Sequence, residues 1–102
     1  MYYIISLKHT HKENKHVCLW QSNNCGYCEC KELAGIYEDY ERGYHDHENY
    51  SMPIKKEKLD GLFIDSVYDS KGTIKKCVPN CKQVWEILGL RMTRNGLVKI
   101  KK

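Results

Sequence analysis

The first third of the chain alternates short apolar runs with polar turns. Residues 2–8 are rich in aromatic and β-branched side chains and predict a β-strand. The polar residues 9–15 predict a turn, and residues 16–20 predict a second strand, so we expect these strands to form an antiparallel hairpin. Residues 25–31 fit either a third short strand or a metal-binding knuckle.

The middle of the chain is charged and rich in tyrosine. Ala34-Gly35 predicts a turn, because glycine readily adopts positive φ values. In residues 37–47 the tyrosines follow the helical spacing i, i+3, i+7, which predicts a short helix. The histidine-containing residues 45–51 predict a loop.

The pattern becomes more regular after this loop. Pro53, whose fixed φ suits a first helical turn, predicts the start of a short helix that covers residues 54–60 and ends at Gly61. Residues 62–68 and 73–78 predict two paired strands, because an Asp-Ser-Lys-Gly turn separates them.

The last quarter predicts one helix and one strand. Asn80 is a suitable N-cap for a helix over residues 81–90, which carries an apolar stripe. Asn95-Gly96 predicts a tight turn, and residues 97–100 predict a final strand.

These elements predict a single α+β domain over residues 1–102, with a curved antiparallel sheet, two or three short helices and a basic tail at residues 99–102. A chain of 102 residues has a small core and would gain from self-association, so a homo-oligomer is among our expectations. No apolar run approaches the roughly 20 residues of a membrane helix. The N-terminal pattern lacks the features of an export signal, so we expect a cytoplasmic protein with reduced cysteines and no membrane partner.

Two close cysteine pairs could bind a metal ion. Cys25 and Cys28 have knuckle-like spacing with a glycine between them, and Cys77 and Cys81 form a second, less regular pair. Four thiolates from two turns would hold one structural zinc. The alternative is that all six cysteines are small, reduced side chains without a cofactor.

Basic residues near both ends of the chain could form one surface together with aromatic residues of the first third. They are Lys8, Lys12, Lys15, Arg91, Arg94 and the tail lysines, and the aromatic residues are Tyr2, Tyr3, Trp20 and Tyr27. A net charge of +4 is mild, but lysines interleaved with aromatic rings are typical of surfaces that bind nucleotides or single strands. We predict a ligand-binding or partner-binding surface from Lys8, His9, Thr10, Trp20, Gly26, Tyr27, Gly35 and Tyr37. The alternative for Trp20 is a place in the core. The chain contains neither a P-loop nor a G-x-G-x-x-G motif, so we expect a binding protein rather than an enzyme.

The opening Tyr-Tyr-Ile-Ile-Ser-Leu-Lys-His-Thr and the later pattern Trp20, Gly26-Tyr27, Ala34-Gly35-x-Tyr37 resemble a family of small proteins of tailed phages and prophages. This resemblance implies a protein of the host cell cytoplasm that is made during infection or carried by a prophage. It also implies, by analogy with other small phage proteins, an accessory role in countering host defence. Cysteines stand here at positions where the family pattern has other residues.

Three functional hypotheses follow. The first is an accessory phage protein that captures a host defence component or a nucleotide-type ligand. The second is a zinc-stabilised nucleic-acid-binding protein, whose affinity would fall steeply with salt. The third is an enzyme with a cysteine nucleophile, which predicts one rapidly alkylated thiol.

Overall fold

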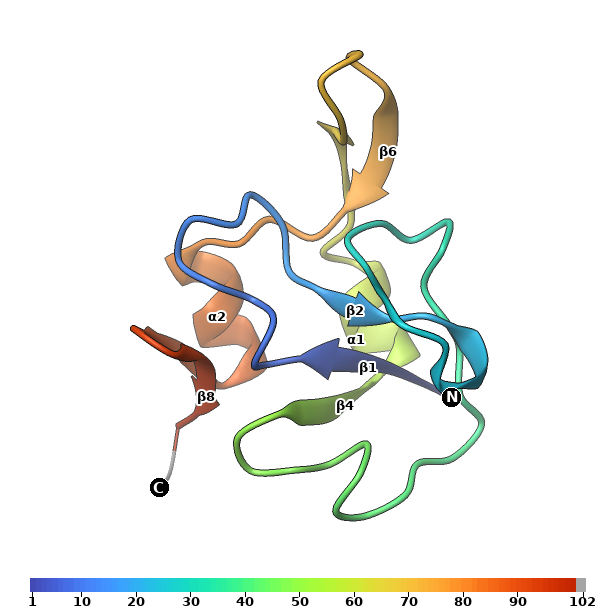
Figure 1. Ribbon diagram of the computed structural model, residues 1–102, viewed down its shortest axis with the longest axis vertical. Helices are drawn as coiled ribbons and strands as arrows, with labels where there is room; N and C mark the ends of the chain where they lie inside the picture. Colours follow the sequence, from blue (N-terminus) through green and yellow to red (C-terminus); the bar gives the residue numbers. More distant parts are fainter. Residues whose placement is uncertain (101–102) are drawn as a thin grey trace.

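The computed structural model describes residues 1–100 and is organised around a four-stranded antiparallel sheet (Figure 1). The strand order is β3-β2-β1-β4. Its members are β1 (Tyr2–Ser6), β2 (Leu19–Trp20), β3 (Tyr27–Cys28) and β4 (Ser51–Lys55), with a short 3-10 turn, η1 (Ser22–Asn24), between β2 and β3. The expected antiparallel pairing of the first two strands is confirmed, with Ile5 opposite Leu19.

Two helices and two hairpins complete the α+β fold predicted from the sequence. These elements are α1 (Lys56–Asp60), β5 (Ile64–Val67), β6 (Ile74–Cys77), α2 (Lys82–Leu88), β7 (Leu90–Thr93) and β8 (Gly96–Lys99). The sequence predicts the hairpin β5–β6 and the helix α2, but it does not predict the pairing of β7 with β8. No helix within residues 1–100 is both long enough and apolar enough to cross a membrane.

The main sheet buries one face in the hydrophobic core, and its other face is partly covered. Because side chains alternate along a strand, Tyr3 and Ile5 of β1 lie on the same face as Leu19 of β2. This face packs in one hydrophobic cluster with Leu59 of α1 and Leu88 of α2. The opposite face carries Ile4, Ser6, Trp20 and Tyr27. Residues 38–50 cover part of this second face, at the bottom of Figure 1.

The helix predicted for residues 37–47 is wrong. This segment forms turns and isolated bridges, and Gly43 has a φ of 83°, which interrupts a right-handed helix. The three tyrosines that suggested a helical stripe contact three different partners. Tyr37 donates to the carbonyl of Gln21, Tyr40 meets Tyr2 edge-to-face, and Tyr44 meets Trp20.

The helix predicted from Pro53 begins later, at Lys56, because Pro53 lies within β4 opposite Ile4. Proline is compatible with this position, since β4 is an edge strand whose outer side needs no ladder hydrogen bond.

Asn80 is not the N-cap of α2, since Cys81 occupies that position. The Asn80 side chain instead donates to the carbonyls of His11 and Asn14 and accepts a hydrogen bond from Trp85 Nε1 at 2.8 Å. Asn80 therefore ties the first turn of the chain to α2.

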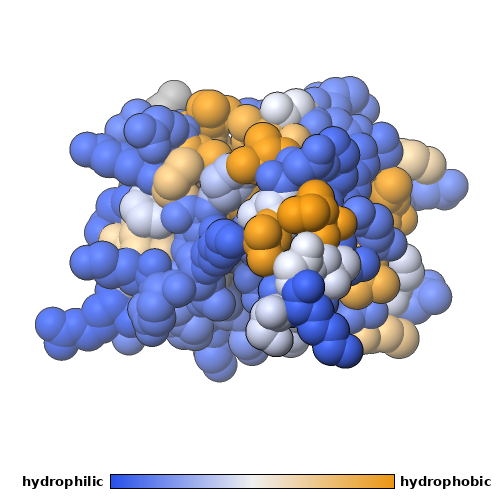
Figure 2. Space-filling view, turned by 90° about the horizontal axis from the view of Figure 1, so that it is seen from above, coloured by the Kyte–Doolittle hydropathy of each residue, from blue (hydrophilic) through white to orange (hydrophobic). Residues whose placement is uncertain are grey.

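The hairpin β5–β6 projects from the body (Figure 1). His16 Nε2 lies 2.7 Å from Ser66 Oγ and Lys15 Nζ donates to the carbonyl of Val67, so the second half of β5 is anchored to the residues that precede β2. Val67 and Ile74 face each other across the strands and are exposed. Seen from the hairpin end, hydrophobic groups stand between broad hydrophilic areas (Figure 2).

The predicted basic tail begins inside a strand. Lys99 belongs to β8, and its ammonium group pairs with the carboxylate of Asp46. Residues 101 and 102 lie outside the described part of the chain.

Candidate functional site

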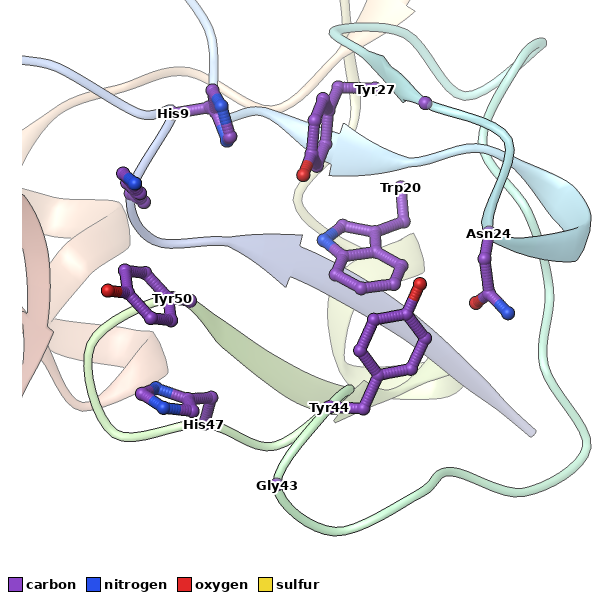
Figure 3. A pocket seen from close by; sticks show the side chains of 10 residues that line it. His9, Trp20, Asn24, Tyr27, Gly43, Tyr44, His47 and Tyr50 are labelled. Atoms are coloured by element: carbon purple, nitrogen blue, oxygen red, sulfur yellow. The ribbon is translucent and has the colours of Figure 1, made fainter.

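A pocket of about 490 Å³ opens between the second face of the sheet and residues 43–50 (Figure 3). Three parts of the chain contribute to it: the turn after β1, the segment from β2 to β3, and the loop before β4. The lining residues are Lys8, His9, Trp20, Asn24, Gly26, Tyr27, Gly43, Tyr44, His47 and Tyr50.

Aromatic rings form most of the pocket wall. Trp20 meets Tyr27 edge-to-face with ring centroids 6.0 Å apart, and meets Tyr44 in the same way at 5.2 Å. On the other side, His47 stacks on Tyr50 at 4.4 Å with an interplanar angle of 30°. These contacts hold several flat apolar faces around one space, and such faces suit a planar ring.

The turn after β1 is fixed by Thr10, which is fully buried. Thr10 Oγ1 donates to the carbonyl of Ser6 at 2.8 Å and accepts from the backbone N–H of Cys18 at 2.9 Å. The backbone N–H of Lys8 donates to the carbonyl of Tyr50. Thr10 thus positions Lys8 and the following residue without lining the pocket itself.

The turn between β2 and β3 depends on two glycines for different reasons. Gly26 has a φ of 105° immediately before Tyr27, a conformation that a residue with a Cβ rarely adopts. Gly35 packs directly on the backbone of η1, where an added Cβ would lie 2.6 Å from the nitrogen of Ser22. The hydroxyl of Tyr37 accepts a hydrogen bond from the backbone N–H of Asn24. Gly35 and Tyr37 therefore support the turn between β2 and β3 through contacts with the backbone of η1.

Hydrogen bonds fix the orientation of His47 in the pocket wall and of His45, which packs behind it against Trp20 and Tyr44. His45 Nδ1 accepts from the backbone N–H of Glu41, so Nε2 donates to Asn24 Oδ1 at 2.7 Å. His47 Nδ1 accepts from the backbone N–H of Asn49 at 3.2 Å, which makes Nε2 the protonated nitrogen of the neutral ring. In both residues the tautomer follows from the backbone donor.

His9 follows the same pattern. Ser6 Oγ accepts from the backbone N–H of His9 and lies 2.9 Å from His9 Nδ1. A serine hydroxyl that donates to Nδ1 leaves the proton of the neutral ring on Nε2. Burial lowers the pKa of His9, and the positive charges of Lys8 and His11 lower it further. His9 is therefore a neutral donor at pH 7, stacked near Tyr27 with centroids 4.1 Å apart.

The pocket is positive and rich in donors. None of the ten lining residues is Asp or Glu. The ammonium group of Lys8 lies over the ring of Tyr50, 4.8 Å from its centroid. Trp20 is 7% exposed, and its Nε1 is a buried side-chain atom without a hydrogen-bond partner within residues 1–100. A ligand with acceptor groups and negative charge would complement these features.

Five of the eight residues predicted for the binding surface line this pocket: Lys8, His9, Trp20, Gly26 and Tyr27. Thr10, Gly35 and Tyr37 support its walls. Sequence reasoning missed the five residues Asn24, Gly43, Tyr44, His47 and Tyr50. The density of histidine and tyrosine in residues 44–50 is the one signal that points to this wall, but the spacing of these residues favours a helix and a loop instead.

The four cysteines predicted to bind zinc lie in different environments. Cys25 is exposed at the end of η1, Cys28 and Cys77 are buried in strands, and Cys81 precedes α2. Within residues 1–100, no three Cys, His, Asp or Glu side chains are arranged to hold a metal ion. The zinc site stays a prediction that metal analysis of the purified protein tests directly.

The buried thiols do not favour the hypothesis of a cysteine nucleophile. Burial raises the pKa of Cys28 to about 11 and that of Cys18 to about 12, with the carboxylate of Glu29 as an additional cause in both. A thiol nucleophile needs a lowered pKa.

A second arrangement places Ser66 Oγ, His16 and Glu29 in the order of a serine–histidine–carboxylate triad. Glu29 Oε1 is 3.8 Å from His16 Nδ1, which is too far for a hydrogen bond. We assign this group to anchoring the hairpin β5–β6.

Comparisons with known proteins do not assign a function to this chain. No protein-family model, curated protein or solved structure matches this chain. The function must therefore be argued from the chemistry of the pocket.

Proposed function

We propose that the protein is a binding module that captures a nucleotide-type ligand, with the base held between the aromatic rings of the pocket. The observation that carries this proposal is the combination of stacked rings, a lysine and an unpartnered indole N–H around one cavity within residues 1–100. A volume of about 490 Å³ lies within the usual range for small-molecule sites.

Charge favours an anionic aromatic ligand over a cationic one. Aromatic cages also bind quaternary ammonium groups. Here, however, Lys8 would repel such a cation, and no carboxylate among the ten lining residues would attract it. A base attached to a phosphate satisfies both requirements, because the base stacks on the rings and the phosphate pairs with the ammonium group.

The cellular role that we propose follows from the resemblance to phage and prophage proteins. A small cytoplasmic protein that sequesters a nucleotide would counter a host defence that uses such a molecule as a signal. The chemistry of the pocket supports the ligand class, and the phage context supports the purpose.

Calorimetric titration of the full chain with the common ribonucleoside monophosphates and their nucleosides tests this proposal. We expect the monophosphates to bind more tightly than the nucleosides. The variant Lys8→Met should reduce that difference, whereas Lys12→Met, at an exposed position of the turn predicted from sequence, should preserve it. No binding of any nucleotide at millimolar concentration would overturn the proposal.

Aromatic variants test the stacking part. Tyr50→Ala should weaken binding about tenfold or more, since one base–ring stack contributes about 1–3 kcal/mol. Tyr68→Ala, in the hairpin β5–β6 region outside the pocket, serves as the matched control. A short single-stranded oligonucleotide provides a second arm. Tighter binding of the strand than of the mononucleotide, with a steep dependence on salt, would favour the nucleic-acid-binding alternative.

A further inference from the structure

We propose that this pocket selects bases with an oxo group at position 6 of a purine or position 4 of a pyrimidine, and that Trp20 Nε1 is the donor that recognises this group. The inference rests on the proposed function and adds the ligand's chemical class, an oxo-base nucleotide, together with the specificity-determining residue.

The first argument is the state of Trp20. Its indole nitrogen can only donate, and it has no partner within residues 1–100 although the atom is buried. Figure 3 shows this nitrogen on the edge of the indole that faces the space between Tyr27 and Tyr50. The other tryptophan is different, because Trp85 Nε1 donates to Asn80. A buried donor without an acceptor is unfavourable, so an arriving acceptor would be favoured at this atom.

The second argument is the polarity of the other lining groups. Lys8 is a donor, and His9 and His47, whose Nδ1 atoms face a hydroxyl and a backbone N–H, present the N–H of Nε2. Asn24 Oδ1 already accepts from His45, which leaves the amide NH₂ of Asn24 as a donor. The tyrosine hydroxyls can either donate or accept. The side chains with a fixed role therefore all donate, and they require an acceptor edge on the ligand.

Access to Trp20 Nε1 requires a small movement, because the atom has almost no exposed surface. Tyr27 packs edge-to-face against Trp20 and is 45% exposed, so turning toward solvent would uncover Trp20 and would break the contact of Tyr27 with His9. We assign Tyr27 as the side chain that turns aside to admit the ligand and then stacks against it.

Matched pairs of bases isolate the proposed contact. Hypoxanthine and adenine differ at one ring position, where an oxo acceptor replaces an amino donor and the neighbouring ring nitrogen gains a proton. Uracil and cytosine differ in the same way. At the position that differs, an amino group would turn an N–H toward the indole N–H, whereas an oxo group offers it an acceptor. One such contact is worth about tenfold in affinity.

Calorimetry with the full chain provides the test, using inosine, adenosine, uridine and cytidine monophosphates. We expect the oxo member of each pair to bind about tenfold more tightly than the amino member. Equal affinities within both pairs, or a preference for the amino bases, would overturn the inference while leaving the proposed function intact. Failure of all four nucleotides to bind would overturn the proposed function and the inference together.

Variants assign the preference to one atom. Trp20→Phe keeps an aromatic ring and removes the N–H, so the preference for oxo bases should disappear while adenosine monophosphate still binds. Trp85→Phe removes an indole N–H outside the pocket and should leave the preference unchanged. Retention of the preference in a folded Trp20→Phe protein would refute the role of Nε1. If circular dichroism shows that this variant is unfolded, the ligand pairs with the unmodified protein decide the question.

Discussion

Replacing Thr10 with valine removes one hydroxyl group from the turn that carries Lys8 and His9 into the pocket. Valine keeps the β-branched shape, so the backbone can retain its conformation. The lost hydroxyl donates to the carbonyl of Ser6 and accepts from the N–H of Cys18 in a fully buried position. The substitution therefore leaves a buried backbone donor without its acceptor.

The expected loss of stability can be worked out from these contacts. An unpaired buried N–H costs about 1–3 kcal/mol, and loss of the second hydrogen bond costs about 1 kcal/mol. Burial of the additional methyl group offsets about 1 kcal/mol. We therefore expect the free energy of unfolding of Thr10→Val to fall by about 2 kcal/mol, a substantial part of the roughly 5–15 kcal/mol typical of a domain.

Urea unfolding followed by circular dichroism measures this loss. Thr10→Ser is the matched control, because it keeps both hydrogen bonds and loses only a buried methyl group, worth about 1 kcal/mol. Amide hydrogen exchange gives a sharper distinction, since exchange of the Cys18 amide should accelerate in Thr10→Val and not in Thr10→Ser. A valine variant as stable as the serine variant, with a protected Cys18 amide, would refute the reasoning.

Three further outcomes follow from the packing and the pKa shifts. Gly35→Ala should lower the free energy of unfolding by about 2–3 kcal/mol, because its methyl group would meet backbone at 2.6 Å. Gly61→Ala, with open space and a helical φ, should stay within about 0.5 kcal/mol of the wild type in the same urea assay, and equal losses would contradict this view. Burial raises the pKa of Asp60, but hydrogen bonds and nearby lysine charges outweigh it, so the pKa is lowered overall. A carboxyl group of this kind contributes stability that is present above the unfolded-state pKa of about 4 and is lost as the pH falls through the folded-state value. Thermal melts from about pH 7 to about pH 2.5 should therefore show a shallower acid limb for Asp60→Asn, and parallel curves would argue against the shift. Brief iodoacetamide treatment at neutral pH should label the exposed Cys25 before Cys28, whose pKa is raised to about 11 by burial, and peptide mass mapping that finds equal labelling would contradict this order.

Local sequence signals are sufficient to predict an element when residues within that element determine its conformation. The Asp-Ser-Lys-Gly turn predicts the hairpin β5–β6, because turn chemistry and strand propensity agree within a few positions. The helix predicted for residues 81–90 ends earlier, at Leu88, because Gly89 adopts the left-handed conformation with a φ of 73°.

Contacts between residues far apart in the sequence explain the elements that were predicted wrongly or missed. The tyrosines of residues 37–47 have helical spacing, but each of them contacts a different residue within the first 21 positions. Sequence reasoning missed strand β4 because its pairing with β1 joins residues about 50 positions apart, and Pro53 argued against a strand. Spacing along the chain carries no information about such partners.

The same limit applies to the pocket. Lys8, His9, Trp20 and the Gly26-Tyr27 pair could be selected from sequence because cations and aromatic rings lie close together there. The opposite wall comes from residues 43–50, which reach the sheet only through the folded path of the loop.

The loop of residues 43–50 forms one wall of the pocket, so its mobility should report whether the pocket holds a ligand. Arg42 is exposed next to Gly43, in a segment of turns that a protease can engage after local opening. A ligand clasped between Trp20 and Tyr50 would hold the loop against the sheet and reduce that opening. Trypsin cleavage after Arg42 should therefore slow in proportion to the fraction of protein bound. Digestion in the presence of different compound mixtures thus offers a screen for the natural ligand that requires neither a label nor a candidate compound.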